Sequence, residues 1–107
     1  MRVKTEYATY ENCYLNVDRY RADYSLAITV YNEEDGPIAN LTTCLPSNGF
    51  VGDDTKSFVD TNNCPWAEDF IKEYHLGVPT GLFEYSGYCA YPLYRFDLNE
   101  LKKHEAK

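Results

Sequence analysis

The stretch FVDTNNCPWAEDFIKEYHLGVPTGLFEYSGYCAYPLYRF, from Phe58 to Phe96, decides the expected fold because it carries both helical and strand signals. A polar turn comes first, followed by apolar residues that recur every three or four positions, which is the period of a helix. A loop containing glycine and proline comes next, and aromatic residues then dominate the end of the stretch, as is typical of a strand. The stretch therefore predicts a helix that packs on a sheet.

The helix is expected between Pro65 and Gly77. Pro65 suits the first helical position, Asn63 or Cys64 would cap it, and Gly77 would end it. Its residues form an apolar stripe and an opposite charged face. The stripe consists of Trp66, Ala67, Phe70, Ile71 and Tyr74, and the charged face of Glu68, Asp69, Lys72 and Glu73. A helix of about eleven residues is marginal alone, so its stability must come from packing the stripe on a sheet.

The first half of the chain predicts antiparallel strands. Residues 12–21 and 25–32 alternate apolar and polar side chains at the period of a half-buried strand. The sequence NEEDG at Asn32–Gly36 is typical of a turn in which glycine supplies a positive backbone angle. The alternating run PIANLTTCL that follows should complete a hairpin with an acidic tip. A loop at Pro46–Lys56 and a short strand at Ser57–Asp60 are expected next.

The last third is predicted as a loop at Val78–Gly81 and an extended segment at Phe83–Leu98. Pro92 cannot donate a ladder hydrogen bond, which indicates an edge strand or a bulge there. The predicted architecture is α+β, with an antiparallel sheet of four to five strands carrying one amphipathic helix on one face. Residues 1–98 are expected to form a single domain, and residues 99–107 a short C-terminal tail with frayed helical turns.

This arrangement predicts one core that joins the hairpin to the helix. Only such packing shields every apolar stripe of the two elements. The residues expected to be buried together are Leu26, Ile28, Val30, Leu41, Trp66, Phe70, Ile71 and Tyr74.

The net charge of −7 is concentrated in one part of the chain. Residues 33–73 carry nine acidic and two basic side chains, so they account for all of the net charge. Such a field opposes direct binding to DNA or RNA and favours a basic protein partner, with ordinary solvated surface as the alternative. Glu68, Asp69 and Glu73 on the outer helix face are therefore candidate binding residues.

Tyrosines punctuate the last extended segment at Tyr88, Tyr91 and Tyr94. They either pack in the core against the helix or form a protein-binding face, where tyrosine is enriched. Stacking on nucleobases would need a neighbouring basic track, which Arg95 alone does not provide. Tyr88 and Tyr91 join the acidic residues as candidate binding residues.

No sequence motif for catalysis is present, and the alternative function is a small enzyme that uses Asp60, Cys64 or His75. A helix N-terminus would lower the pKa of the Cys64 thiol. His75, however, would lie roughly 16 Å along the same helix, too far to activate it. The four cysteines lack the short spacing of structural zinc sites, so neither a metal nor another cofactor is expected.

The four cysteines, Cys13, Cys44, Cys64 and Cys89, also bear on location. The N-terminus lacks the apolar core of a signal peptide, and no apolar run reaches the roughly 18 residues that span a bilayer. We therefore expect a soluble cytoplasmic protein without membrane contact, in which the cysteines are free thiols. The sequence does not indicate the oligomeric state.

Three strings resemble the uncharacterised bacterial family known as domain of unknown function 4313. They are FVDTNNCPWAEDFI, HLGVPTG and SGYCAYPLYRFDL, and the hairpin pattern at Asp35–Thr42 also fits, so the resemblance runs from about Ser25 to Leu98. The resemblance implies a short single-domain protein, often encoded on mobile genetic elements, with no assigned activity. The expected function is a non-catalytic accessory protein that binds another protein, such as a host nucleic-acid-binding or defence factor.

Overall fold

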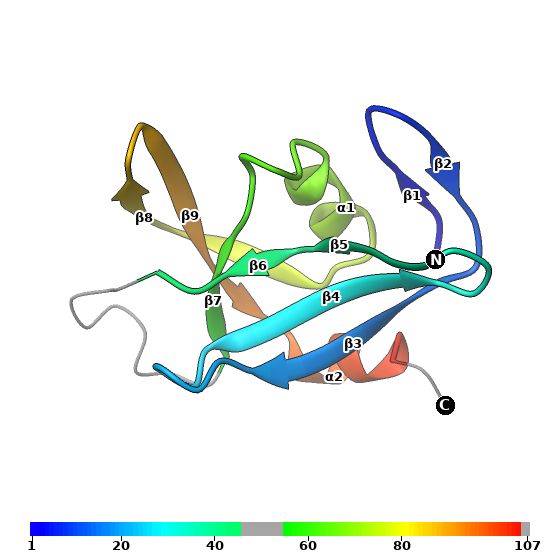
Figure 1. Cartoon of the computed structure of the whole chain (residues 1–107). Helices are drawn as coiled ribbons and strands as arrows, with labels where there is room; N and C mark the ends of the chain where they lie inside the picture. Colours follow the sequence, from blue (N-terminus) through cyan, green and yellow to red (C-terminus); the bar gives the residue numbers. More distant parts are fainter. Residues whose placement is uncertain (46–54, 106–107) are drawn as a thin grey trace.

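The computed structural model describes residues 1–45 and 55–105, which fold into three antiparallel sheets and two helices (Figure 1). Most of the expected loop at Pro46–Lys56 lies outside the described residues. The strands are β1 (Val3–Lys4), β2 (Thr9–Tyr10), β3 (Cys13–Arg19), β4 (Leu26–Asn32), β5 (Gly36–Asn40), β6 (Thr42–Thr43), β7 (Lys56–Val59), β8 (Gly77–Ser86) and β9 (Cys89–Phe96). The helices are α1 (Ala67–Glu73) and α2 (Leu98–Lys103).

The predicted hairpin is confirmed as β4 and β5, and β3 pairs with the other side of β4. Every second residue of β4 is buried, as the alternation of its side chains predicts. At the acidic tip, Gly36 adopts a φ of 77°, and the side-chain oxygen of Asn32 accepts the N–H groups of Glu34 and Asp35. The turn therefore forms for the reason that its composition indicates.

The expectation of one sheet with four to five strands is wrong, because the chain passes between two sheets at Leu41. The N–H of Leu41 donates to the carbonyl of Ile28 in β4, at 2.8 Å. The carbonyl of Leu41 accepts the N–H of Asp60, just after β7, at 2.9 Å. β6 thus joins a second sheet with the order β6-β7-β9-β8. A side-chain bond from Ser57 to the carbonyl of Leu26, at 2.7 Å, links the two sheets in the interior. The α+β class itself is confirmed.

Helix α1 is present but shorter than predicted. It begins at Ala67 after an N-cap, Trp66, that makes no side-chain capping bond, and it ends at Glu73. The polar residues before it form a separate turn, in which the Asp60 carboxylate accepts the backbone N–H and the side-chain amide of Asn63. His75, with a φ of 55°, turns the chain back toward the sheet, so Gly77 is not the helix stop.

Gly77 has a different role at the start of β8. A Cβ there would lie 2.6 Å from the carbonyl oxygen of Arg95 and 3.1 Å from the Cα of Phe96. Real Cβ atoms do not approach backbone this closely, so only glycine allows β8 to lie against β9 at this point.

The main core joins the three-stranded sheet to α1, as predicted. Among the residues expected there, Leu26, Ile28, Val30, Leu41, Phe70 and Ile71 are buried, and Trp66 and Tyr74 pack against them partly exposed. Leu101 of α2 is also buried in this core, and the N–H of Leu15 donates to the carbonyl of His104. In a smaller cluster, Leu45, which follows β6, packs with Phe58 of β7 and Leu93 of β9.

The last third of the chain differs most from its prediction. The expected loop at Val78–Gly81 and single strand at Phe83–Leu98 are replaced by a hairpin of β8 and β9. Ser86 pairs with Cys89 across a two-residue turn in which Gly87 has a φ of 62°. Glycine at the first position of such a turn matches the type II′ hairpin, a signal that SGYC already contains.

Pro92 lies in an inner strand, not at the sheet edge, because β9 is flanked by both β7 and β8. The pairing of β7 with β9 ends at Phe58 and Leu93, so it stops at the residue that follows Pro92 and does not include Pro92. The pairing of β8 with β9 is irregular between Pro79 and Phe83, beside the same point. Pro92 is thus accommodated where the pairing with β7 has ended, so no paired β7 residue is left without the N–H that proline lacks.

Candidate functional site

The hairpin tip, defined as residues 82–91, carries the largest group of exposed apolar side chains in the described part of the chain. Its most exposed members are Leu82, Phe83, Tyr85 and Tyr88. Tyr85 is 75% exposed and Tyr88 is fully exposed. Figure 1 shows the tip projecting beyond the other strands at the upper left. Large exposed apolar groups that lie next to each other mark interaction sites more often than single ones do.

The exposure of the tip follows from the lengths of its neighbours. Near the base of the hairpin, Tyr94 and Phe96 of β9 are buried in the core that includes α1. Beyond Leu93, β7 no longer pairs with β9. On the face that Phe83 and Tyr85 share with Pro92 and Ala90, burial decreases toward the turn: Pro92 is buried and Ala90 only partly buried, whereas Phe83 and Tyr85 on the outer strand are exposed. The tip is therefore a two-stranded extension of the sheet.

The predicted tyrosine candidates divide between the core and the surface. Tyr94 is buried and donates a hydrogen bond of 2.7 Å to the carboxylate of Glu68. Burial, together with this bond, raises the pKa of the Tyr94 phenol. Tyr91 is half-buried against the Leu45, Phe58 and Leu93 cluster, and Tyr88 lies at the hairpin turn. Of the two tyrosines predicted to bind, only Tyr88 is fully available for contact.

The predicted acidic candidates lie on α1 and are all exposed. Glu68 is oriented by Tyr94, whereas Asp69 and Glu73 line a depression of about 860 Å³ beside Trp66 and Phe70. Three cations, Arg2, Lys4 and Lys72, line the same depression. The acidic face of the helix therefore borders basic side chains, which the sequence did not predict because Arg2 and Lys4 come from β1 and its preceding residue.

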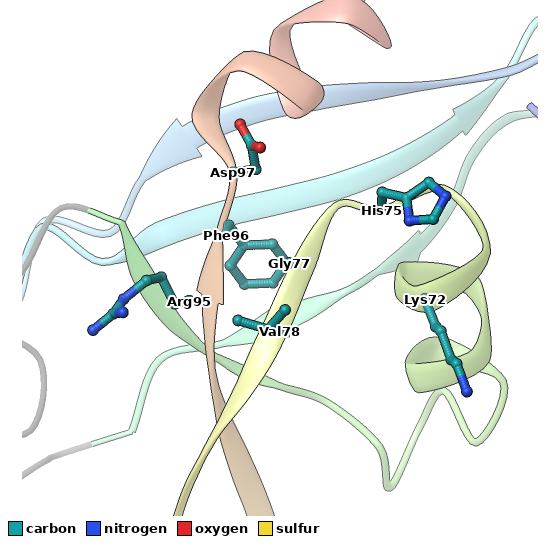
Figure 2. Close-up of a pocket in the computed structure, with 7 residues that line it drawn as sticks. All are labelled: Lys72, His75, Gly77, Val78, Arg95, Phe96 and Asp97. Atoms are coloured by element: carbon teal, nitrogen blue, oxygen red, sulfur yellow. The ribbon is translucent and has the colours of Figure 1, made fainter.

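A second, smaller cleft of about 460 Å³ lies at the base of the hairpin (Figure 2). Lys72 and His75 approach it from the end of α1, and Arg95 lies on the other side of β8, beside Val78. Its remaining lining includes Phe96 and Asp97, whose carboxylate already caps α2 by accepting the N–H groups of Asn99 and Glu100. The structure thus collects cations at the base of a hairpin whose tip is apolar.

The three residues of the enzyme alternative are not assembled into one site. Cys64 precedes α1 and is buried, whereas His75 follows α1 and is exposed. Burial, with the nearby carboxylate of Asp60, raises the pKa of the Cys64 thiol to about 11. The thiol contacts the carbonyl of Asn40 at 3.5 Å. A buried thiol with a raised pKa is a weak nucleophile near neutral pH.

All four cysteines are free thiols. Within residues 1–45 and 55–105, no group of three or more histidine, cysteine or acidic side chains is arranged to hold a metal ion. None of the helices described there is long and apolar enough to cross a membrane.

A family model described as a domain of unknown function, DUF4313, matches residues 14–107. The match includes the hairpin tip, α1 and the smaller cleft, and it excludes β1 and β2 and therefore the Arg2 and Lys4 side of the larger depression. No curated protein and no solved structure matches the chain.

Proposed function

The chain belongs to the DUF4313 family, and we propose that it is a non-catalytic protein-binding module whose contact surface is the hairpin tip. The observation that supports the proposal is the exposure of Leu82, Phe83, Tyr85 and Tyr88 on one projecting hairpin. Exposed aromatic side chains contribute most of the binding energy in many protein interfaces, because a partner removes large apolar areas from water.

The shape of the tip supports binding over a purely structural role. Its apolar side chains contribute little to folding, since they remain in contact with water in the free chain. The two-residue turn and the regular pairing from Phe83 to Ser86 still hold these side chains in a fixed arrangement. A surface that is already ordered loses less conformational entropy when it binds.

The net charge of −7 supports a partner with a basic surface, which the field of the protein attracts before contact. We retain Glu68, Asp69 and Glu73 as the residues that guide this encounter, although cations also border them on α1. We place the protein in the cytoplasm, where its four free thiols would stay reduced. The mobile-element setting implied by the family resemblance favours a host protein as partner, such as a nucleic-acid-binding or defence factor.

The test compares two tyrosines that are both exposed. The full chain, attached to a resin, captures partners from a bacterial lysate, and so do the variants Tyr85→Ser at the tip and Tyr7→Ser in the loop between β1 and β2. Tyr7 is 90% exposed, so its replacement controls for the loss of a surface tyrosine as such. We expect Tyr85→Ser to lose at least one captured protein that Tyr7→Ser retains. Identical capture by all three proteins would contradict the proposal.

A further inference from the structure

The backbone groups of β9 can be assigned to its two sides from two contacts. The N–H of Phe96 donates to the backbone carbonyl of Thr55 on the β7 side, at 2.7 Å. The carbonyl of Leu93 accepts from the Thr80 hydroxyl on the β8 side, at 2.8 Å. Because backbone groups alternate sides along a strand, those of Tyr91 and Cys89 also face β8.

This assignment determines which groups of β8 are left for another strand. Glu84 and Ser86 pair with Tyr91 and Cys89, so their backbone groups bond to β9. The N–H and C=O groups of Phe83 and Tyr85 must then point away from β9, because neighbouring residues alternate. β8 is the outer strand of its sheet, and within residues 1–45 and 55–105 no strand pairs with this edge. The edge at Phe83 and Tyr85 is therefore open.

The inner half of β8 carries features that prevent strand addition, and the outer half does not. Pro79 lacks an N–H, and by the same alternation its missing donor would face the open edge. The irregular stretch from Pro79 to Phe83, with Gly81 at a φ of 89°, interrupts the regular edge. Proline and bulges of this kind block edge-to-edge pairing in natural sheets. From Phe83 to Ser86 the pairing is regular and contains no such feature.

A second copy of the chain is a poor occupant of this edge. In an antiparallel pair that matches Phe83 with Tyr85 of the other copy, Glu84 would lie directly opposite its own equivalent. Like charges in that position destabilise a strand pair. Each copy also carries a net charge of −7, which adds repulsion over a longer range.

These observations define the complementary strand. Phe83 and Tyr85 lie on one face of β8 and Glu84 on the other, beside Tyr91. We propose that the hairpin tip binds an extended segment of a partner protein, which adds to β8 at Phe83–Ser86 and carries a basic residue between two apolar residues. The apolar residues contact Phe83 and Tyr85, and the basic residue lies opposite Glu84. The inference rests on the proposed function and specifies its mode, strand addition at a free edge.

The test begins with a displayed library of random heptapeptides selected against the full chain. We expect the selected peptides to share an apolar–basic–apolar alternation. A synthetic peptide from this group should bind Glu84→Lys about fivefold more weakly than the unchanged chain, as the reversal of a cross-strand charge pair implies. Exchanging its basic residue for glutamate should restore binding to Glu84→Lys. The exposed Glu6 provides a control, since Glu6→Lys makes the same change in net charge away from the tip.

Hydrogen exchange supplies an independent measurement that needs no charge change. The bound peptide should slow exchange of the Phe83 and Tyr85 amides at least tenfold, while the amides of α1 stay unchanged. A selection without enriched peptides, or enriched peptides that bind without protecting these amides, would overturn the inference. A dimer of the free chain in analytical ultracentrifugation that dissociates in the Tyr85→Ser variant would overturn it as well, by placing a second copy at the edge.

The outcomes for the two proposals can be separated. If capture from a lysate depends on Tyr85 but a captured partner leaves the Phe83 and Tyr85 amides unprotected, the protein-binding function stands and strand addition fails. If capture does not depend on Tyr85, the proposed function itself fails.

Discussion

Helix α1 and the hairpin tip are neighbours in sequence and rich in the same kinds of side chain, yet their surroundings are opposite. Phe70 on α1 is 4% exposed, whereas Phe83 on β8 is 55% exposed. Sheet residues from β4 and β9 lie in the same core as Phe70, whereas Phe83 lies on the outer strand, beside a part of β9 that β7 no longer pairs with. The comparison teaches that the length of adjacent elements, more than residue type, decides which apolar side chains stabilise the fold and which remain available for contact.

The largest effect on stability should come from replacing Phe70 with alanine, and the same replacement at Phe83 serves as the comparison. Phe70→Ala leaves a cavity in the core and should lower the free energy of unfolding by about 3–5 kcal/mol. Phe83→Ala removes an exposed side chain and should change it by about 0.5 kcal/mol or less. Denaturant titration measures both values. A loss of less than about 1 kcal/mol for Phe70→Ala would show that the helix stripe does not face a core.

The base of the hairpin should be more sensitive than its tip. Gly77→Ala forces a methyl group against the carbonyl of Arg95 and should cost about 1–3 kcal/mol, as overpacking does elsewhere. Ser86→Ala, near the exposed end of the same strand, should stay within about 0.5 kcal/mol. Thermal unfolding of the two variants compares them directly. Equal effects would mean that the base of β8 is as loosely packed as its tip.

The buried thiol of Cys64 should make the free energy of unfolding depend on pH. Its pKa of about 11 in the folded chain lies above the ordinary value of 9.0. Burial therefore favours the neutral thiol. Its contribution to the free energy of unfolding is fully present below pH 9 and is lost as the pH rises toward 11. Between pH 9 and pH 11, the free energy of unfolding should decline less for Cys64→Ala than for the unchanged chain. Parallel declines would remove Cys64 as a cause.

The smallest effect on folding is expected on the outer face of α1. Changing Glu68, Asp69 and Glu73 together to glutamine should change the free energy of unfolding little, because all three are exposed and glutamine at position 68 keeps an oxygen that can accept from Tyr94. Association with a captured partner should become slower and depend less on ionic strength. The measurement is the association rate at several salt concentrations. Rates that respond neither to salt nor to the triple change would leave these charges a role in solubility alone.

The sequence predicted those elements whose signals are local. Alternation predicted β3, β4 and their hairpin partner, and the three- and four-residue spacing predicted α1 and its buried residues. It could not predict the passage between sheets at Leu41, because the alternation continues unbroken through that residue while its hydrogen bonds go to two different strands. The strand at Val78–Gly81 was missed because its proline and glycine are typical of loops.

The candidate site was only partly accessible from the sequence, for a related reason. Tyr88, Tyr91 and Tyr94 are equally spaced, yet one lies at a turn, one faces the small cluster and one faces α1. Recognising SGYC as a two-residue hairpin turn would have separated them, since the turn places Tyr88 at the tip. The cations that line the two clefts come from the β1 region, α1 and β9, so only the fold brings them together.

Amide hydrogen exchange along β8 in the free chain tests the contrast between the packed core and the hairpin tip most directly. The open edge predicts that Phe83 and Tyr85 exchange markedly faster than Glu84 and Ser86, whose amides bond to β9. Amides of the buried strand β4, such as that of Ile28, should exchange most slowly. Protection of Phe83 and Tyr85 equal to that of Glu84 would show that the edge is covered in the free protein, which contradicts its availability for a partner.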